Sequence, residues 1–460
     1  MKKSLNLLLA ATSLLACTSQ NSHYQFQVAD LETNLITLSS DEFLGRMPFT
    51  EGEKITTSFL EQEFKKMGLE PGNGESYFQD VPMVSITSSP SEKMEFKGAK
   101  GNLTAEGLKD FVIWTQRTDS LVAVENAEVV FAGFGIVAPE YGWNDYKNLD
   151  VKGKIVVVLV NDPGFGTEDA SLFKGNTMTY YGRWTYKYEE AARQGALGCL
   201  IVHNTIPAGY GFNVIQNSWN ASKLYLDDRG KEKYKLGFEG WITLPTANKL
   251  FELTGMNESE LLAKARKSDF EPIPMGITAS ASIQVKAEYN VSQNVVAKVT
   301  GKSKPEEVII YSAHWDHLGI GKPDEKGDTI YNGALDNASG TAALLALAKA
   351  FKTDAQPERT VVFLAVTAEE QGLWGSAYYA QNPIYPKERT VANINMDSFL
   401  PGTEISPQIV VMGAGKSETD AWLERRATEQ GRTLIPDPAP QAGGFYRSDH
   451  FPLAKMGVPA

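Results

Sequence analysis

The chain has 460 residues, of which 42% are hydrophobic and 22% are charged, as in ordinary globular proteins. Because a chain of this length exceeds one ordinary hydrophobic core, two or three structural units are expected. The formal net charge of −12 argues against a nucleic-acid partner, since phosphate binding requires a basic face.

The N-terminal segment MKKSLNLLLAATSLLAC has the pattern of a secretory signal. Two lysines, Lys2 and Lys3, precede a short apolar run that ends in small residues. This run is too short to span a bilayer as a permanent helix. Residues 1–16 are therefore predicted to be a signal peptide, and the mature protein is expected to be exported.

The letters LLAC, which end at Cys17, resemble the lipobox of bacterial lipoproteins. In those proteins the cysteine becomes the lipid-modified first residue of the mature chain. The resemblance therefore implies membrane attachment through a lipid on Cys17, with residues 17–26 as a tether. Thr18 follows the cysteine, which by the same resemblance favours the outer membrane or a periplasm-facing location. An ordinary signal with a chance cysteine is the alternative.

Residues 27–115 are predicted to be the first part of the domain that the C-terminal third completes. Within this segment, apolar residues recur at the spacing of one helical face, and Gly68 and Pro71 mark the end of the helix. The apolar positions are Ile55, Phe59, Leu60, Phe64 and Met67.

Residues 116–285 differ in character, because short β-rich runs alternate there with Gly, Pro and Asn turns. The runs are AEVVFAGFGIV, GKIVVVLVNDPG, GALGCLIVHN and GWITLPTANKLFELTG. Between them, YKYEEAARQGA predicts one helix that ends at Gly195. The GKIVVV strand and the helix–Gly-Ala–strand unit resemble the protease-associated (PA) domain, a β-rich insert of several peptidase families. An inserted PA domain is therefore expected.

In residues 286–460, strands alternate with helices. Strands are predicted in QNVVAKVTG, EEVIIYSAH, RTVVFLAVTAEE and TVANINMD, and a last strand in SDHFPLAKMGVPA. Helices are predicted in NASGTAALLALAKAFK, GLWGSAYYAQ and KSETDAWLERRATEQG. The predicted fold class is α/β, with a mostly parallel twisted sheet that is covered by helices on both faces.

Polar side chains with metal-binding capacity follow each of these strands in turn. They are His314 and Asp316 at the end of EEVIIYSAH, Asp336 in the loop before the next helix, Glu369 and Glu370 at the end of RTVVFLAVTAEE, and Asp397 at the end of TVANINMD. Ligands of open α/β sheets collect at the carboxyl ends of the strands. Carboxylates that converge there repel one another unless cations neutralise them. Imidazole and carboxylate ligands together suit Zn²⁺, with Mn²⁺ or Co²⁺ as reasonable substitutes.

The stretch YSAHWDHLG contains two of the five histidines of the chain. In a His-x-Asp pair, the aspartate can hold the imidazole N–H, an arrangement common at zinc sites. His314 is therefore predicted to bind metal and Asp316 to orient it, while His317 is expected at the rim of the site.

Four motifs in this order and spacing resemble the M28 family of co-catalytic zinc peptidases, which are mainly aminopeptidases. The motifs are HWDHLG, GALDNASG, TAEEQGLWGS and NINMDS, and the early segment LSSDEFLGRMP also matches the family pattern. The resemblance thus extends over nearly all of the expected mature chain. It implies a zinc exopeptidase-like fold and two zinc ions per chain.

The resemblance also implies a role for each matching residue. Asp336 would bridge the two metals, His314 and Asp397 would hold one of them, and Glu370 would hold the other. Glu369 would be the general base, which takes a proton from water and passes it to the leaving amine.

Three further expectations concern single residues and bonds. The peptide bond between Asp336 and Asn337 is expected to be cis, as is frequent in the family. Tyr446, in GGFYRSDH, is a candidate hydroxyl donor to the oxyanion, with a packing aromatic as the alternative. His450 is a weak candidate for a metal ligand, because the family places this Ser-Asp-His near the substrate pocket.

The sequence departs from the family at its end. The last metal ligand of the family is a His beyond SDHFPLAKMGVPA, and this chain stops at Ala460. Either the sequence is a fragment truncated at the C-terminus, which we favour, or one metal is weakly held at an incomplete second site.

The predicted activity is that of a metal-dependent exopeptidase, most readily an aminopeptidase that acts on peptides, with no obligate protein partner. Two alternatives stay open. One is a carboxypeptidase, dipeptidase or aminoacyl cyclase that uses the same site. The other is a non-catalytic binding protein with a degenerate metal site.

Overall fold

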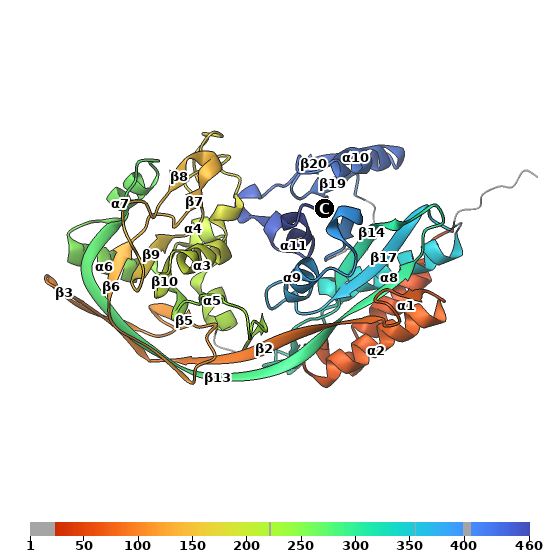
Figure 1. Cartoon of the computed structure of the whole chain (residues 1–460), viewed down its shortest axis with the longest axis horizontal. Coiled ribbons are helices and arrows are strands. Elements are labelled where there is room, and N and C mark those ends of the chain that lie inside the picture. The colour runs from red at the N-terminus through yellow and green to blue at the C-terminus, as the bar shows by residue number, and fades with distance from the viewer. Residues whose placement is uncertain (1–23, 220–221, 355, 399–405) are drawn as a thin grey trace, which may run out of the picture.

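The computed structural model describes residues 24–219, 222–354, 356–398 and 406–460. The predicted signal peptide over 1–16 and the lipid site at Cys17 lie outside these residues. Within them, no helix combines the length and the apolar character that crossing a membrane requires. Figure 1 shows two lobes side by side, joined along one edge by long strands.

The joining strands are β2 (Phe78–Pro90) and β13 (Ile273–Val299), which pair antiparallel over most of the length of β2. Both run from one lobe into the other (Figure 1). One sheet is therefore continuous through the described part of the molecule, in the order β18-β14-β17-β13-β6-β9-β10-β12-β5. We call residues 24–78 and 291–460 the α/β lobe, and residues 93–285 the insert lobe.

The sheet of the α/β lobe is parallel at its centre. Strand β14 (Lys304–His314) pairs parallel with β17 (Arg359–Val366) and with β18 (Thr390–Asn395), and β13 closes the other side antiparallel. Helices α2 (Glu51–Lys66) and α8 (Ser339–Thr353) cover one face, and α9 (Trp374–Gln381) and α11 (His450–Lys455) cover the other. The predicted α/β class is confirmed.

Helix α2 forms where the apolar spacing predicts it. The Thr50 side chain caps its N-terminus by accepting the Gly52 N–H at 3.2 Å, and the helix gives way to Gly68 in a left-handed conformation. Leu60 and Phe64 are completely buried against β13 and β17. Each such side chain stabilises the fold by about 1.5–3 kcal/mol relative to an exposed one.

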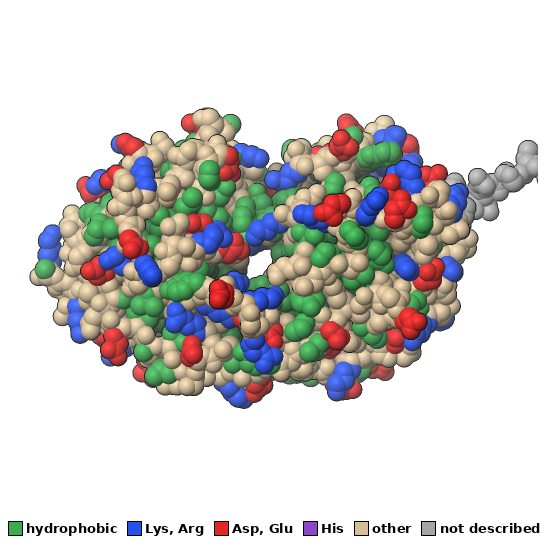
Figure 2. All heavy atoms as spheres, viewed as in Figure 1, with side chains coloured by type: hydrophobic (Ala, Val, Ile, Leu, Met, Phe, Trp, Pro, Cys, Tyr) green, Lys and Arg blue, Asp and Glu red, His purple; other side chains and the backbone are tan. Residues whose placement is uncertain are grey.

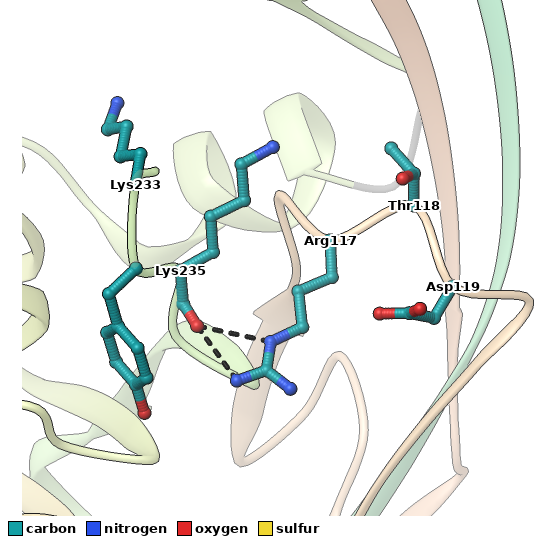
Figure 3. A pocket seen from close by; sticks show the side chains of 6 residues that line it. Arg117, Thr118, Asp119, Lys233 and Lys235 are labelled. Atoms are coloured by element: carbon teal, nitrogen blue, oxygen red, sulfur yellow. Dashed lines mark hydrogen bonds between the residues drawn. The ribbon is translucent and has the colours of Figure 1, made fainter. Parts of the chain in front are cut away.

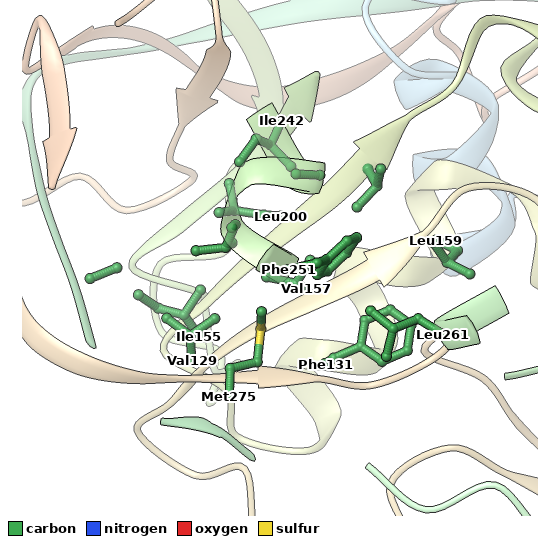
Figure 4. Close-up of a cluster of buried hydrophobic side chains, with 14 of the residues drawn as sticks. Val129, Phe131, Ile155, Val157, Leu159, Leu200, Ile242, Phe251, Leu261 and Met275 are labelled. Carbon is green, nitrogen blue, oxygen red and sulfur yellow. The ribbon is translucent and has the colours of Figure 1, made fainter. Parts of the chain in front are cut away.

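The insert lobe has its own core. Strands β6 (Leu121–Phe131), β9 (Ile155–Leu159), β10 (Gly198–His203) and β12 (Phe238–Thr243) are parallel, and β5 (Phe111–Trp114) is antiparallel at the edge. Figure 4 shows Val129, Phe131, Ile155, Val157, Leu200 and Ile242 of these strands packed with Phe251 and Leu261. Helix α3 (Trp184–Arg193) ends just before Gly195, as predicted.

Three sequence predictions differ from the structure. The insert lobe begins before residue 116, because β3 (Lys93–Gly98), β4 (Gly101–Glu106) and β5 pair with its strands. The run GWITLPTANKLFELTG is a strand followed by helix α6 (Leu244–Thr254), since Pro245 fits a first helical turn. The last predicted strand is helix α11, whose Pro452 also lies in the first turn and whose Leu453 packs against α9.

The remaining elements are shorter or lie at the margins of the lobes. They are α1 (Val28–Leu38), β1 (Glu70–Pro71), β7 (Val137–Ala138), β8 (Trp143–Asn144), α4 (Thr205–Ala208), α5 (Phe212–Trp219), β11 (Lys223–Leu226), α7 (Glu258–Ala265), β15 (Gly319–Ile320), β16 (Ile330–Tyr331), β19 (Gln408–Val411), α10 (Thr419–Glu429) and β20 (Thr433–Pro436).

Candidate metal centre

The predicted ligands come from one edge of the sheet of the α/β lobe. His314 is the last residue of β14, Glu369 and Glu370 follow β17, and Asp397 follows β18. These three strands are parallel neighbours, so their carboxyl ends meet. Asp336 reaches the same place from the turn before α8, and its peptide bond to Asn337 is cis, as the resemblance implies.

A first ligand group consists of His314, Asp336 and Asp397. One ligand atom from each lies within 4.8 Å of the others. The His314 Nε2 atom is 3.1 Å from Asp336 Oδ1 and 3.5 Å from Asp397 Oδ1. The structure therefore brings together the residues that the resemblance assigns to one metal.

A second group consists of His317, Asp336 and Glu370. The His317 Nδ1 atom is 2.7 Å from Glu370 Oε1. Asp336 is common to both groups, which is the position of a bridging ligand. His317 was predicted at the rim, whereas in the structure its imidazole turns toward Glu370 and its side chain is only 13% exposed. The sequence signal for a place of His317 at the centre was its position three residues after His314.

Two unpaired polar atoms in the first group indicate that the group can hold a cation. His314 Nε2 and Asp336 Oδ1 are buried polar atoms that have no hydrogen-bond partner, a costly state that a metal ion relieves. Burial favours the neutral form of His314, but the neighbouring carboxylates of Asp336 and Asp397 nevertheless raise its pKa well above the usual value. The same histidine lowers the pKa of Asp397 against the opposing effect of burial. The group thus attracts positive charge.

Asp316 acts differently from the prediction. Its carboxylate lies 3.7 Å from His314 Nδ1, too far for a hydrogen bond, and the Asp316 backbone carbonyl contacts that nitrogen at 3.1 Å instead. The buried carboxylate accepts the Glu369 N–H at 3.0 Å. Burial raises the pKa of Asp316 to about 7. Asp316 therefore fixes the turn that carries the two glutamates, while its main chain orients the imidazole.

Glu369 and Glu370 point in different directions. A Glu369 carboxylate oxygen lies 3.9 Å from His314 Nε2, beside the first group, whereas Glu370 belongs to the second. The Glu369 side chain is 12% exposed, and burial raises its pKa well above the usual value. A carboxylate with a raised pKa next to a cation site suits a general acid and base.

Arg46 is a residue of the site that the sequence analysis did not single out. Its buried guanidinium donates to the carbonyls of Trp315 at 2.8 Å, Leu38 and Asn332 at 2.6 Å, and Gly333 at 2.9 Å. It therefore ties the loop after His314 to the loop before Asp336. Arg46 lies in the motif LSSDEFLGRMP, so its sequence signal was that match to the family pattern.

The segment before α11 supplies Ser448 together with the two further candidates, Tyr446 and His450. Ser448 Oγ donates to Asp397 Oδ2 at 2.5 Å and holds that carboxylate. The ring of Tyr446 packs against Tyr180 and Phe451, and in the described residues its hydroxyl has no recorded contact with either ligand group. His450 packs against Phe445 and belongs to neither group. The oxyanion role of Tyr446 stays a prediction.

The fold and the site together define an α/β protein with a histidine-and-carboxylate cation centre at the carboxyl ends of parallel strands. Residues 294–460, which contain every ligand of both groups, match Peptidase family M28. The predicted resemblance to this family is therefore confirmed over this segment.

Two curated relatives illustrate the likeness. A "Probable zinc metalloprotease" from Pyricularia oryzae is 40% identical over 106 residues, which are 23% of this chain and 20% of that protein. "Aminopeptidase NAALADL1" from Mus musculus is 32% identical over 137 residues, which are 28% of this chain and 17% of that protein. The chain thus spans about a fifth of the length of these relatives.

A solved structure supports the fold over a greater length. The aminopeptidase from Aneurinibacillus sp. strain AM-1 is 20% identical and superposes with a TM-score of 0.50. The match covers 95% of this chain and 84% of that one, so it includes both lobes.

Proposed function

We propose that the protein is a zinc-dependent aminopeptidase that removes N-terminal residues from peptides. The observation that carries the proposal is the pair of ligand groups that share Asp336, with Glu369 beside the first. The zinc metalloprotease and aminopeptidase names of the relatives support the same reading.

The residues present fit two zinc ions. His314, Asp336 and Asp397 would hold the first, and Asp336 and Glu370 the second, with His317 as the imidazole nearest to them. Bound zinc polarises a carbonyl oxygen and lowers the pKa of water. Within the chain, Arg46 and the Asp316 main chain keep the ligand loops in place, and Ser448 holds Asp397.

Glu369 would move the proton of the reaction. It would take a proton from the attacking water at its carboxylate oxygen and give it to the nitrogen of the leaving amine. Its position next to His314 and its raised pKa both support this assignment.

The insert lobe supports a preference for chain ends and short peptides. The α4 segment and the Met178 region of this lobe approach residues 440–442 of the α/β lobe, and Met178 N–H donates to the Pro440 carbonyl at 3.1 Å. We infer that the lobe is a protease-associated domain that narrows access to the centre.

The test is hydrolysis of leucine p-nitroanilide by the purified chain, with and without a chelator and added zinc. We expect zinc-dependent release of p-nitroaniline, no cleavage of N-acetylated peptides, and about two zinc equivalents per chain by metal analysis. Cleavage of blocked peptides at the C-terminus would instead support the carboxypeptidase alternative. Absence of bound zinc after zinc addition would support the non-catalytic binding protein.

We also propose that the mature protein is an exported lipoprotein attached through Cys17. The N-terminal pattern supports this, and labelling with a radioactive fatty acid tests it. The label should appear on the wild-type chain and be lost from Cys17→Ser.

A further inference from the structure

A small cavity lies where the insert lobe meets the segment before α11. Its walls are mostly apolar side chains of the insert lobe, but three polar side chains, Arg183, Tyr210 and Arg447, also line it. Arg183 and Tyr210 come from the insert lobe, and Arg447 comes from the α/β lobe. Figure 2 shows Lys and Arg side chains at the border of the hollow between the two lobes.

The two arginines lack acidic partners. In the described part of the chain, the Arg183 side chain makes no recorded hydrogen bond or ion pair, and its Nε is buried without an acceptor. Arg447 donates one bond, to the Ala442 carbonyl at 2.9 Å, and likewise has no recorded carboxylate within those residues. Burial and the nearby Arg447 lower the pKa of Arg183 to about 10.

The insert lobe has a second hollow lined by basic side chains, and there the basic side chains are paired with other groups of the protein. There, Arg117 donates two bonds to the Lys235 carbonyl, at 2.8 and 3.1 Å (Figure 3). Lys235 Nζ in turn lies 2.8 Å from the Asp228 carboxylate. The arginines of the junction have no such internal partner, so their charge remains available to a ligand.

Two guanidinium groups at one cavity repel one another, and burial of the Arg183 group is costly without an anion, whereas Arg447 is exposed to solvent. The planar fork of arginine matches a carboxylate with two parallel hydrogen bonds. The Tyr210 hydroxyl could add a third donor. The cavity itself is small, about 10 Å³, so a carboxylate would bind at its opening, where Arg447 is exposed.

The cavity lies close to the metal centre along the chain. Arg447 directly precedes Ser448, which holds the ligand Asp397. Because consecutive Cα atoms are about 3.8 Å apart and an arginine side chain is of the order of 7 Å long, its guanidinium is within about 15 Å of the centre. An extended peptide covers that distance in three or four residues at about 3.3–3.6 Å each.

We propose that Arg183 and Arg447 form a subsite for a carboxylate of the bound peptide, three or four residues beyond the cleaved bond. The carboxylate is the C-terminal one of a short peptide or the side chain of an acidic residue at that position. This inference rests on the proposed peptidase function and narrows its substrate class.

Binding to the zinc-loaded Glu369→Gln chain tests the proposal without requiring turnover. The titrants are Leu-Gly-Gly-Gly as the free acid, the same peptide as its C-terminal amide, and Leu-Gly-Gly-Asp amide. We expect the free acid to bind about ten- to a hundredfold more tightly than the plain amide, as for hydrogen bonds to a charged group. If Leu-Gly-Gly-Asp amide recovers this affinity, the subsite accepts an acidic side chain; if it does not, the subsite reads the chain terminus.

Two substitutions, Arg183→Gln and Arg447→Gln, made together in that background should abolish the preference for the acid and leave binding of the amide unchanged. Arg389→Gln removes an exposed arginine at the opposite end of β18 and should preserve the preference. Arg447→Gln alone changes an exposed side chain and should give a partial loss, even if Arg183→Gln disturbs folding.

Equal binding of acid and amide by the parent chain, failure of both to bind, or a preference that survives the double substitution would overturn the proposal. Lack of hydrolysis of leucine p-nitroanilide by the wild type would instead count against the peptidase function, and the carboxylate preference can still be read from the titration.

Discussion

Glu369 and Glu370 illustrate how neighbouring residues can serve two different tasks. The turn after β17 is held because the Asp316 carboxylate accepts the Glu369 N–H, and the two side chains leave it in different directions. One carboxylate then faces His314 and the other faces His317. The division of roles therefore depends on one buried aspartate as much as on the glutamates themselves.

Replacing Glu369 by Gln should keep zinc binding and lose most turnover. The amide preserves the size of the side chain but cannot accept a proton, and general acid–base catalysis contributes about 10²–10⁴-fold to a rate. We expect kcat for leucine p-nitroanilide to fall by about this factor, with unchanged zinc content by metal analysis. Glu388→Gln, at an exposed position, should retain the full rate; near-normal kcat in Glu369→Gln would refute the base assignment.

Arg46 should control both stability and metal affinity. Arg46→Met leaves four carbonyls without their donor, at least two of which lie in the loops that carry ligands. Loss of such a buried charged donor costs about 3–5 kcal/mol, and loss of a residue that supports ligands lowers metal affinity by about 10–100-fold. Urea unfolding and zinc titration measure the two effects. Arg46→Lys should recover part of the stability but, lacking the guanidinium fork, little of the zinc affinity.

At the scale of elements, the centre depends on the register of β14, β17 and β18. Their parallel pairing places three strand ends at one edge, and α8 begins directly after the turn that carries Asp336. In the insert lobe the same parallel arrangement ends in no ligand group that the described residues reveal.

Glu239 on β12 should make the insert lobe sensitive to pH. Burial raises the pKa of Glu239 to about 7. The hydrogen bonds that Trp114 and Gln116 donate to it and the charge of Lys233 lower this pKa, whereas the charge of Glu189 raises it. Because the folded pKa exceeds the unfolded value of 4.5, its contribution to stability is complete below the unfolded pKa. This contribution is lost as the pH rises toward 7.

The loss amounts to about 3 kcal/mol at 1.36 kcal/mol per pKa unit. Urea unfolding of the metal-free chain at intervals from pH 4.5 to 8, followed by tryptophan fluorescence, measures it. In the Glu239→Gln chain, residue 239 cannot ionise. Its free energy of unfolding should therefore fall by about 3 kcal/mol less over this pH range than that of the wild type. Parallel curves for the two chains would exclude Glu239 as the source.

At the scale of the whole molecule, β2 and β13 make the two lobes parts of one sheet (Figure 1). The 27 residues of β13 pair with β6 in the insert lobe and with β17 in the α/β lobe. The insert is therefore anchored by a shared strand rather than by a loose linker. Lobes that share a strand keep a constant distance from one another, which would let the metal centre and the proposed arginine subsite bind the same peptide.

Zinc should stabilise the whole chain. A ligand that binds only the folded state at a hundred times its Kd adds about 2.7 kcal/mol, so the Tm of the metal-free chain should rise by several degrees on addition of zinc. Asp336→Ala removes a ligand common to both groups and should abolish the rise. Asp269→Ala, at an exposed site in the insert lobe, should leave it intact. A full rise in Asp336→Ala would place the zinc elsewhere.

The sequence by itself determined the α/β class, an early amphipathic helix that ends near Gly68, and most of the residues that meet at the centre, because apolar periodicity and motifs of a few residues are local properties of the chain. The tertiary structure alone decided which atoms meet there: the main chain of Asp316 on His314, the turn of His317 toward Glu370, and the guanidinium of Arg46 between two loops. It also decided that β3–β5 join the insert lobe and that residues 450–455 are helical. Those features depend on partners tens to hundreds of residues away, and no local spacing encodes such contacts.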